Sequence, residues 1–381
     1  MRNRFLGWIG TALLLGAGAS VAAQDDVPEA LQFQGYEISR VGDFGEVAID
    51  SRGDTEELVL TRAAVLLGGA ELSEGVIEFD VAFDATRGFG GLMWHVGDDP
   101  GDYEYFYLRK HKSGLPDAGQ YTPARGGLTS WQIYSDTNAM APLAFTYDGW
   151  NRIRFVIADD KADIYFNGSP MPVLHIPDLA TDRGNGGVGF RTSGPNGVLR
   201  IANLTIRDLA PGEGIVGTPS DVPAPPDGVI ARWRVSKGFD ESLVADALSL
   251  PSEVEDLPSI AELSSEPTGI VDLSRAITPE DGADTALVST RIIAAEATRV
   301  RLRFGYSDRL RLFLNGELIF DGVAGFRQRD FFFLGTVGFD DAVVLELEEG
   351  ENVLSAAVSE TFGGWGFAAS IADGEGLQIS P

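Results

Sequence analysis

Apolar residues alternate with polar or small residues over many short stretches of this chain, and a two-residue period predicts β-strands. The clearest stretch is 75–83, where Ile77, Phe79, Val81 and Phe83 point to one face. The same alternation predicts further strands at 89–96, 103–110, 129–134, 150–158, 162–166, 187–192 and 198–207. No long amphipathic helical pattern interrupts these stretches, so this part of the chain predicts a β-sandwich or jelly roll.

A second block of alternating stretches follows after residue 228. It predicts strands at 286–294, 299–305, 309–314, 317–321, 342–347, 352–359 and 366–372. Residues 211–228 are rich in Pro and Gly and have no periodicity, which is typical of a linker, although a surface loop inside one domain has the same composition. We therefore expect an all-β chain with two β-sandwich domains, a jelly roll at 28–210 and a smaller sandwich at 229–381.

Two Asn-Gly pairs mark tight turns. Asn167-Gly168 and Asn315-Gly316 each follow a predicted strand, and both residue types accept the positive φ angles of a type I′ turn.

The first 23 residues have the pattern of a secretory signal. Arg2 and Arg4 precede an apolar run at 6–17, and the small residues Val21, Ala22 and Ala23 provide a cleavage site. The run is short and Gly-rich, so a membrane anchor is the weaker interpretation. No later stretch is apolar enough to span a bilayer. We expect a periplasmic or secreted protein that does not insert into a membrane.

Charge and cysteine content exclude several functions. The net charge of −28 disfavours nucleic acid and anionic lipid as partners. The chain has no cysteine, which excludes thiol catalysis, cysteine metal sites and an N-terminal lipid-modified cysteine. An exported chain without disulfides must be held together by its hydrophobic cores.

The stretch 103–134 concentrates aromatic and basic residues. Aromatic rings beside charged groups are what a sugar site needs, since rings pack on sugar carbons and charged groups bind hydroxyls. The predicted ligand-binding residues are Arg109, His111, Lys112, Asp117, Tyr121, Trp131 and Tyr134, with Trp365 in the second block. An ordinary aromatic-rich sheet edge has the same composition, and a tryptophan among glycines also suits packing over a glycine backbone.

An acidic turn provides a candidate metal site. Asp98, Asp99 and Asp102 supply carboxylates in a compact loop, and calcium takes six to eight oxygen ligands. The spacing does not match an EF-hand, and a solvated acidic turn is the commoner use of such a sequence. The prediction is therefore no cofactor, with calcium as the candidate if one binds.

Arginines alternate with apolar residues at Arg299, Arg301 and Arg303 and again at Arg309 and Arg311. If the two strands pair as a hairpin, the five guanidinium groups share one face. The positive charge of that face would be neutralised by the acidic segment 253–266 or 346–351. Alternatively, the face would form an anionic-glycan site with Arg327 and Arg329.

Several of these stretches come in the order seen in concanavalin A-like lectin/glucanase jelly rolls, most similar to laminin-G-like and 3-keto-disaccharide hydrolase-type domains. They are 75–83, Tyr107-Leu108-Arg109, 131–134, 150–154 and 162–168. The second block, through 308–316, 350–354 and 363–367, resembles galactose-binding-like domains.

The resemblance implies a carbohydrate ligand, an oligo- or polysaccharide, but not a reaction. Glucanases of this fold place one further Glu two or three residues after a Glu-x-Asp pair on the same strand. Here Glu78 and Asp80 match that pair, but Ala82 and Phe83 stand where the second acid would be. We expect binding without catalysis. The alternative is an enzyme acting on keto-glycosides, with His111 and Arg109 as catalytic candidates. An adhesive or structural envelope module is the third possibility.

Overall fold

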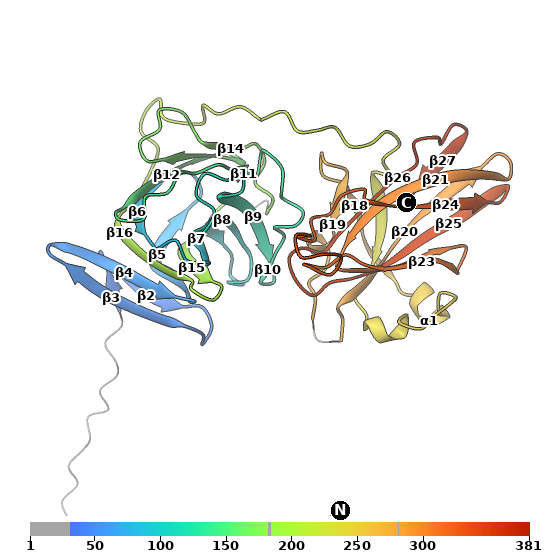
Figure 1. Ribbon diagram of the computed structural model, residues 1–381, viewed down its shortest axis with the longest axis horizontal. Coiled ribbons are helices and arrows are strands. Elements are labelled where there is room, and N and C mark those ends of the chain that lie inside the picture. The colour runs from blue at the N-terminus through green and yellow to red at the C-terminus, as the bar shows by residue number, and fades with distance from the viewer. Residues whose placement is uncertain (1–30, 182–183, 281) are drawn as a thin grey trace, which may run out of the picture. The chain divides into compact units, whose positions relative to one another are not determined.

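The computed structural model describes residues 31–181, 184–280 and 282–381, and within them the protein is all-β (Figure 1). The predicted signal at 1–23 lies outside the described residues. Strands β1 to β16 form two sheets, and strands β17 to β27 form two others. The fold class predicted from the alternation is confirmed.

The first sandwich consists of a nine-stranded and a seven-stranded sheet. The first sheet has the order β1-β2-β5-β15-β7-β8-β9-β10, with β11 on β9. Its strands are β1 Gln32–Phe33, β2 Tyr36–Arg40, β5 Ala64–Leu72, β7 Phe89–Val96, β8 Tyr103–Arg109, β9 Gly119–Arg125, β10 Leu128–Thr129, β11 Met140–Ala141 and β15 Gly186–Ser193. The second sheet has the order β14-β13-β12-β6-β16-β4-β3. Its strands are β3 Glu46–Arg52, β4 Thr55–Thr61, β6 Gly75–Ala82, β12 Asn151–Ala158, β13 Lys161–Phe166, β14 Leu174–Ile176 and β16 Val198–Arg207.

The core of this sandwich lies between its two sheets. Ile77, Phe79 and Val81 of β6 are fully buried there, as their alternation predicted. On the opposite face of β6, Asp80 accepts a hydrogen bond from Arg152 at 3.2 Å, and Glu78 also pairs with Arg152. These two acids are therefore ion-paired strand residues.

The second sandwich has a seven-stranded and a four-stranded sheet. The larger has the order β18-β17-β20-β25-β22-β23, with β27 on β20, and the smaller has the order β19-β26-β21-β24. The strands of the larger sheet are β17 Arg232–Ser236, β18 Ser259–Ser264, β20 Thr285–Ala294, β22 Arg309–Leu314, β23 Glu317–Val323, β25 Gly350–Ser359 and β27 Leu377–Ser380. Those of the smaller sheet are β19 Ile270–Asp272, β21 Thr298–Ser307, β24 Asp341–Leu347 and β26 Gly366–Ser370. Its short helices are η1 Glu241–Leu243, α1 Ser252–Glu255 and η2 Leu273–Arg275.

The predicted five-arginine hairpin is wrong. Strand β21 belongs to the smaller sheet and β22 to the larger one, so the two sets of arginines do not share a face. Arg299 donates to Glu346 at 2.6 Å, which agrees with neutralisation by 346–351. Arg309 instead donates to Glu241 at 2.7 Å, and Arg311 to Asp321 at 3.0 Å.

Both Asn-Gly turns have the predicted backbone. Asn167 and Gly168 have φ angles of 48° and 73°, and Asn315 and Gly316 have 50° and 83°. Leu314 pairs directly with Glu317, so the second pair makes a two-residue hairpin between β22 and β23.

The segment predicted as a linker is attached to the first sandwich. The backbone N–H groups of Val216 and Gly217 donate to Asp163 at 2.7 and 2.9 Å, and Ser220 N–H donates to Asn138 at 2.7 Å. Asp163 also pairs with His175 at 2.7 Å. This part of the chain therefore follows a defined path.

Candidate functional site

Strand β8 is buried on both of its faces, and its tyrosines lie on one of them. Tyr103, Tyr105 and Tyr107 are at most 7% exposed, and they pack with Met93 on one face while Phe106 and Leu108 enter the core on the other. Burial raises the pKa of Tyr107 to about 12, and its hydroxyl donates to Gln120 at 2.7 Å. These rings are not open to a ligand.

The predicted charged residues next to β8 pair with one another. Arg109 is 7% exposed and donates to the backbone oxygen of Asp117 at 3.0 Å and to Gln120. Lys112 pairs with the Asp117 carboxylate. Partial burial, together with Arg87, Lys112 and Arg109, lowers the pKa of His111, which favours the neutral imidazole. Lys112, Asp117 and His111 are only half-buried, so they stay within reach of a ligand.

The predicted strand at 129–134 is wrong, because β10 ends at Thr129 and a turn follows. The Ser130 carbonyl accepts hydrogen bonds from the N–H groups of Ile133 and Tyr134 at 3.0 and 3.1 Å. The Gln120 amide donates to the carbonyls of Trp131 (2.8 Å) and Tyr134. The backbone carbonyls of this turn are thus satisfied by the Gln120 side chain and not by a neighbouring strand.

Gln132 in this turn contacts the second sandwich. Its amide donates to the Leu334 carbonyl at 2.9 Å and accepts from the Ser307 hydroxyl at 2.9 Å. Its backbone N–H donates to Gly363 O at 2.9 Å. Gln132 is fully buried, so these bonds replace its water contacts. The turn that carries Trp131 therefore also joins the first sandwich to the second.

Trp365 is fully buried in the core of the second sandwich, where its indole N–H donates to the Val358 carbonyl at 2.9 Å. No face of its ring is open to a sugar, because the core covers both faces. Of the two interpretations given by its glycine neighbours, the structure favours packing.

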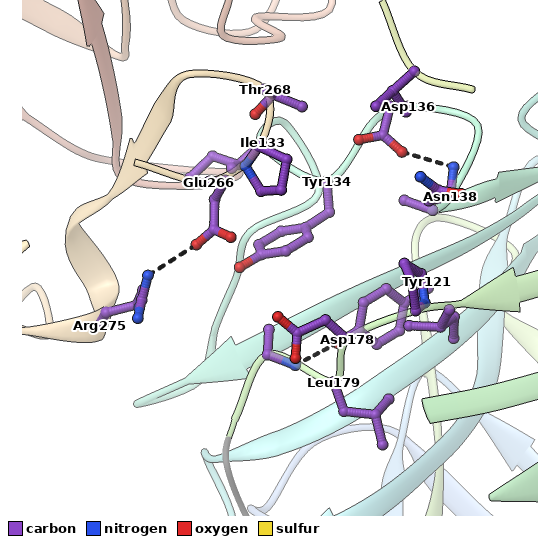
Figure 2. A pocket seen from close by; sticks show the side chains of 16 residues that line it. Tyr121, Ile133, Tyr134, Asp136, Asn138, Asp178, Leu179, Glu266, Thr268 and Arg275 are labelled. Atoms are coloured by element: carbon purple, nitrogen blue, oxygen red, sulfur yellow. Dashed lines mark hydrogen bonds and ion pairs between the residues drawn. The ribbon is translucent and has the colours of Figure 1, made fainter. Parts of the chain in front are cut away.

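A cleft with an estimated volume of about 150 Å³ lies beside Tyr134 (Figure 2). Two of the predicted ligand-binding residues, Tyr121 and Tyr134, line it. Figure 2 shows the Tyr134 ring between Glu266 and Arg275 on one side and Asp136 and Asn138 on the other. Its remaining lining residues are Ile133, Ala139, Ile176, Pro177, Asp178, Leu179, Ala180, Val222, Pro267 and Thr268.

Two carboxyl groups in this cleft favour protonation more than ordinary carboxyls do. Burial raises the pKa of Asp136, although backbone N–H groups of Asn138 and Ala139 oppose the shift. Burial also raises the pKa of Glu266, against the opposing effect of Arg275, which donates to it at 3.1 Å. Carboxyl, amide, guanidinium and aromatic groups together can bind hydroxyls and cover a sugar ring.

Tyr121 supports the cleft wall from the core side. Its hydroxyl donates to the fully buried Glu104 at 2.6 Å and accepts from Ala180 N–H at 2.9 Å. Next to it, Arg125 pairs with Asp272 at 2.8 Å. Because Glu104, Tyr121 and Asp272 are buried, these polar contacts lie away from water and stabilise the wall.

Sequence reasoning did not find Asp136, Glu266 or Arg275. They lie far apart in the chain and outside any strand pattern, so no periodicity or motif joins them. Arg109, His111, Lys112 and Asp117 do not line the cleft.

The acidic turn proposed for calcium has backbone partners. Asp99 accepts from Gly101 N–H at 2.8 Å, and Asp102 accepts from Gly126 N–H at 2.6 Å, while Asp98 is exposed. Within the described ranges, no three His, Asp or Glu side chains form a group that could hold a metal ion. Calcium at Asp98, Asp99 and Asp102 stays a prediction.

A second carboxyl pair lies next to Gln132. Asp308 accepts from the N–H groups of Thr361 and Phe362, each at 3.0 Å, and Glu360 accepts from Gly364 N–H at 3.1 Å. Burial, followed by the nearby Asp308, raises the pKa of Glu360 to about 8. Because both acids are at most 5% exposed, this pair is a structural element and not an open site.

No family model and no curated protein matches this sequence. Among solved structures, the chain is similar to the carbohydrate binding module CBM66 from Bacillus subtilis, with 15% identity and a TM-score of 0.35 over 45% of this chain and 95% of that chain. It is also similar to a Bacillus subtilis protein of unknown function with a galectin-like fold, with 14% identity and a TM-score of 0.34 over 45% and 89%. A third is the Bacillus licheniformis beta-glucanase, with 10% identity and a TM-score of 0.31 over 47% and 95%.

Proposed function

We propose that this protein is an exported carbohydrate-binding protein and that the cleft beside Tyr134 holds the glycan. The observation that supports the proposal is the combination, in one cleft, of an aromatic ring with carboxyl, amide and guanidinium groups. The ring offers an apolar face to sugar carbons, and the polar groups offer donors and acceptors to hydroxyls. Trp131, His111, Lys112 and Asp117 lie outside this cleft and are not needed for it.

A glycan array of neutral and acidic oligosaccharides, probed with and without calcium, tests the proposal. Binding to the best glycan is then measured by calorimetry for Arg275→Gln and for Arg232→Gln. Both arginines are exposed and paired with a glutamate, but only Arg275 lines the cleft. Losing a charged hydrogen bond to the ligand weakens binding roughly tenfold. We expect that loss for Arg275→Gln and no change for Arg232→Gln. No binding across the array, or equal effects of both variants, contradicts the proposal.

The raised pKa values of Asp136 and Glu266 favour a second candidate, an enzyme acting on glycosides, because a protonated carboxyl is the general acid that such reactions need. The resemblance to 3-keto-disaccharide hydrolase-type domains suggests 3-keto-glycosides as the first substrates to try. Turnover that is lost in Glu266→Gln and kept in His111→Ala would support this cleft as the centre. The reverse result would support His111.

A further inference from the structure

Three phenylalanines of the second sandwich are exposed to an unusual degree. Phe331 is 66%, Phe332 85% and Phe362 56% exposed. Phe331 and Phe332 lie in the loop between β23 and β24, and Phe362 lies between β25 and β26. Apolar rings gathered at a surface mark an interaction site more often than a lone exposed ring does.

The loop holds its two phenylalanines outward through defined contacts. The Asp330 carboxylate accepts from the N–H groups of Phe332 and Phe333 at 2.7 and 2.9 Å. Arg329 pairs with Asp341 and lies 5.2 Å from the centre of the Phe333 ring, which packs on the core. The loop therefore has a defined conformation, and in that conformation Phe331 and Phe332 are exposed.

A chain of contacts through the Arg327 guanidinium links the exposed rings to Trp131. The Arg327 guanidinium lies 4.3 Å from the centre of the Phe331 ring and 5.0 Å from that of Phe326. Phe326 in turn contacts Trp131 at 6.2 Å and Phe362 at 6.3 Å between ring centres. We call Phe331, Phe332, Phe326, Phe362 and Arg327 together the Phe331 surface.

The ring orientations decide between kinds of partner. Phe331 and Phe332 are at 88° to each other, and Phe326 and Phe362 at 73°. A polysaccharide stacks on flat faces that lie side by side, which this edge-to-face cluster does not offer. Rings set edge to face beside a guanidinium suit an interface of flexible apolar chains with phosphate groups.

We propose that the Phe331 surface binds the surface of a phospholipid bilayer, with Phe331 and Phe332 entering the acyl boundary and Arg327 pairing with a lipid phosphate. The net charge of −28 repels an anionic membrane, so the partner is a bilayer of zwitterionic lipid. This is peripheral contact. In the part of the chain that the structure describes, no helix is long and apolar enough to cross a bilayer. The proposal is independent of glycan binding.

Co-flotation of the whole protein with phosphatidylcholine vesicles tests the proposal. We expect the protein to float with these vesicles, and we expect less binding when phosphatidylglycerol is added. The double variant Phe331→Ser/Phe332→Ser should lower the bound fraction about tenfold or more, and Arg327→Gln severalfold. The matched control is Phe44→Ser, which removes a 46% exposed ring of the first sandwich and should leave binding unchanged.

Three results would overturn the proposal. The first is that the unaltered protein does not float. The second is equal loss of binding in Phe44→Ser. The third is that the double variant converts a dimer into a monomer or abolishes binding to a glycan while vesicle binding persists, since a second copy or a sugar would then be the occupant. Circular dichroism of each variant verifies that it is folded, as expected for changes at exposed positions.

Discussion

The turn from Ser130 to Tyr134 and the loop from Phe326 to Phe333 are both aromatic-rich, but they use their aromatic residues in opposite ways. In the turn, backbone and side chains are fixed by Gln120, Ser307 and Leu334. In the loop, Asp330 and Arg329 hold the backbone while Phe331 and Phe332 remain in solvent. Aromatic density along a sequence therefore does not distinguish a buried junction from an exposed surface, whereas the burial of the side chains does.

The largest effect should come from removing the buried amide of the turn. Gln132→Ala leaves the Ser307 hydroxyl and the Leu334 carbonyl without their partner and opens a cavity. We expect a loss of about 3 kcal/mol in the free energy of unfolding, measured by urea denaturation. Gln328→Ala in the exposed loop is the matched control, with a loss below about 0.5 kcal/mol. Equal effects of the two changes would remove the contrast between the regions.

Glu360 should make stability depend on pH. Its pKa is about 8 in the folded protein and near its ordinary value when unfolded. Between these values the folded state holds the extra proton, so stability falls as pH rises through this window. We expect Glu360→Gln to be more stable than the unaltered protein by about 2 kcal/mol at pH 6 and similar to it at pH 4. Thermal unfolding at both pH values provides the measurement, and a stabilisation that is the same at both would contradict it.

Tyr121→Phe tests the wall of the cleft. The change removes a hydroxyl that bonds Glu104 and the Ala180 N–H, and it leaves the buried carboxylate short of one donor. We expect a loss of about 1 to 2 kcal/mol in urea denaturation. Tyr36→Phe, at a half-buried tyrosine outside the cleft, should change stability little. A neutral Tyr121→Phe would mean that this network does not hold the wall.

The smallest effect should come from the exposed loop. Phe332→Ser removes a ring that is 85% exposed, so little apolar contact is lost on the folded side. The free energy of unfolding should change by less than about 0.5 kcal/mol. A loss above about 1.5 kcal/mol would show that the ring packs in the folded protein. That result would contradict the contrast between an exposed loop and a buried turn.

Local periodicity predicted many of the strands, because alternation reports directly on a face packed against a core. The stretches 89–96, 198–207 and 309–314 match β7, β16 and β22 at both ends. Periodicity failed where partners that are distant in the sequence determine the local structure. Strand β9 was missed because Gly119 and Pro123 break its pattern, and 129–134 is a turn because the Gln120 side chain and Gly363 satisfy its backbone.

The candidate site was only partly predictable. Tyr121 and Tyr134 were found because aromatic clustering is visible in the sequence, but Asp136, Glu266 and Arg275 meet only through the fold. The pairing of β21 and β22 failed for the same reason, since a two-residue period identifies a strand and not its neighbour.

The buried Gln132 has a consequence for the ancestry and engineering of this protein. Transplanting either sandwich into another polypeptide would break the hydrogen bonds that Gln132 makes to Leu334, Ser307 and Gly363 and would expose these groups to water. Each half thus carries polar groups that are matched to the other half. Any recombination that exchanged one of them would have to carry a compensating change in the other.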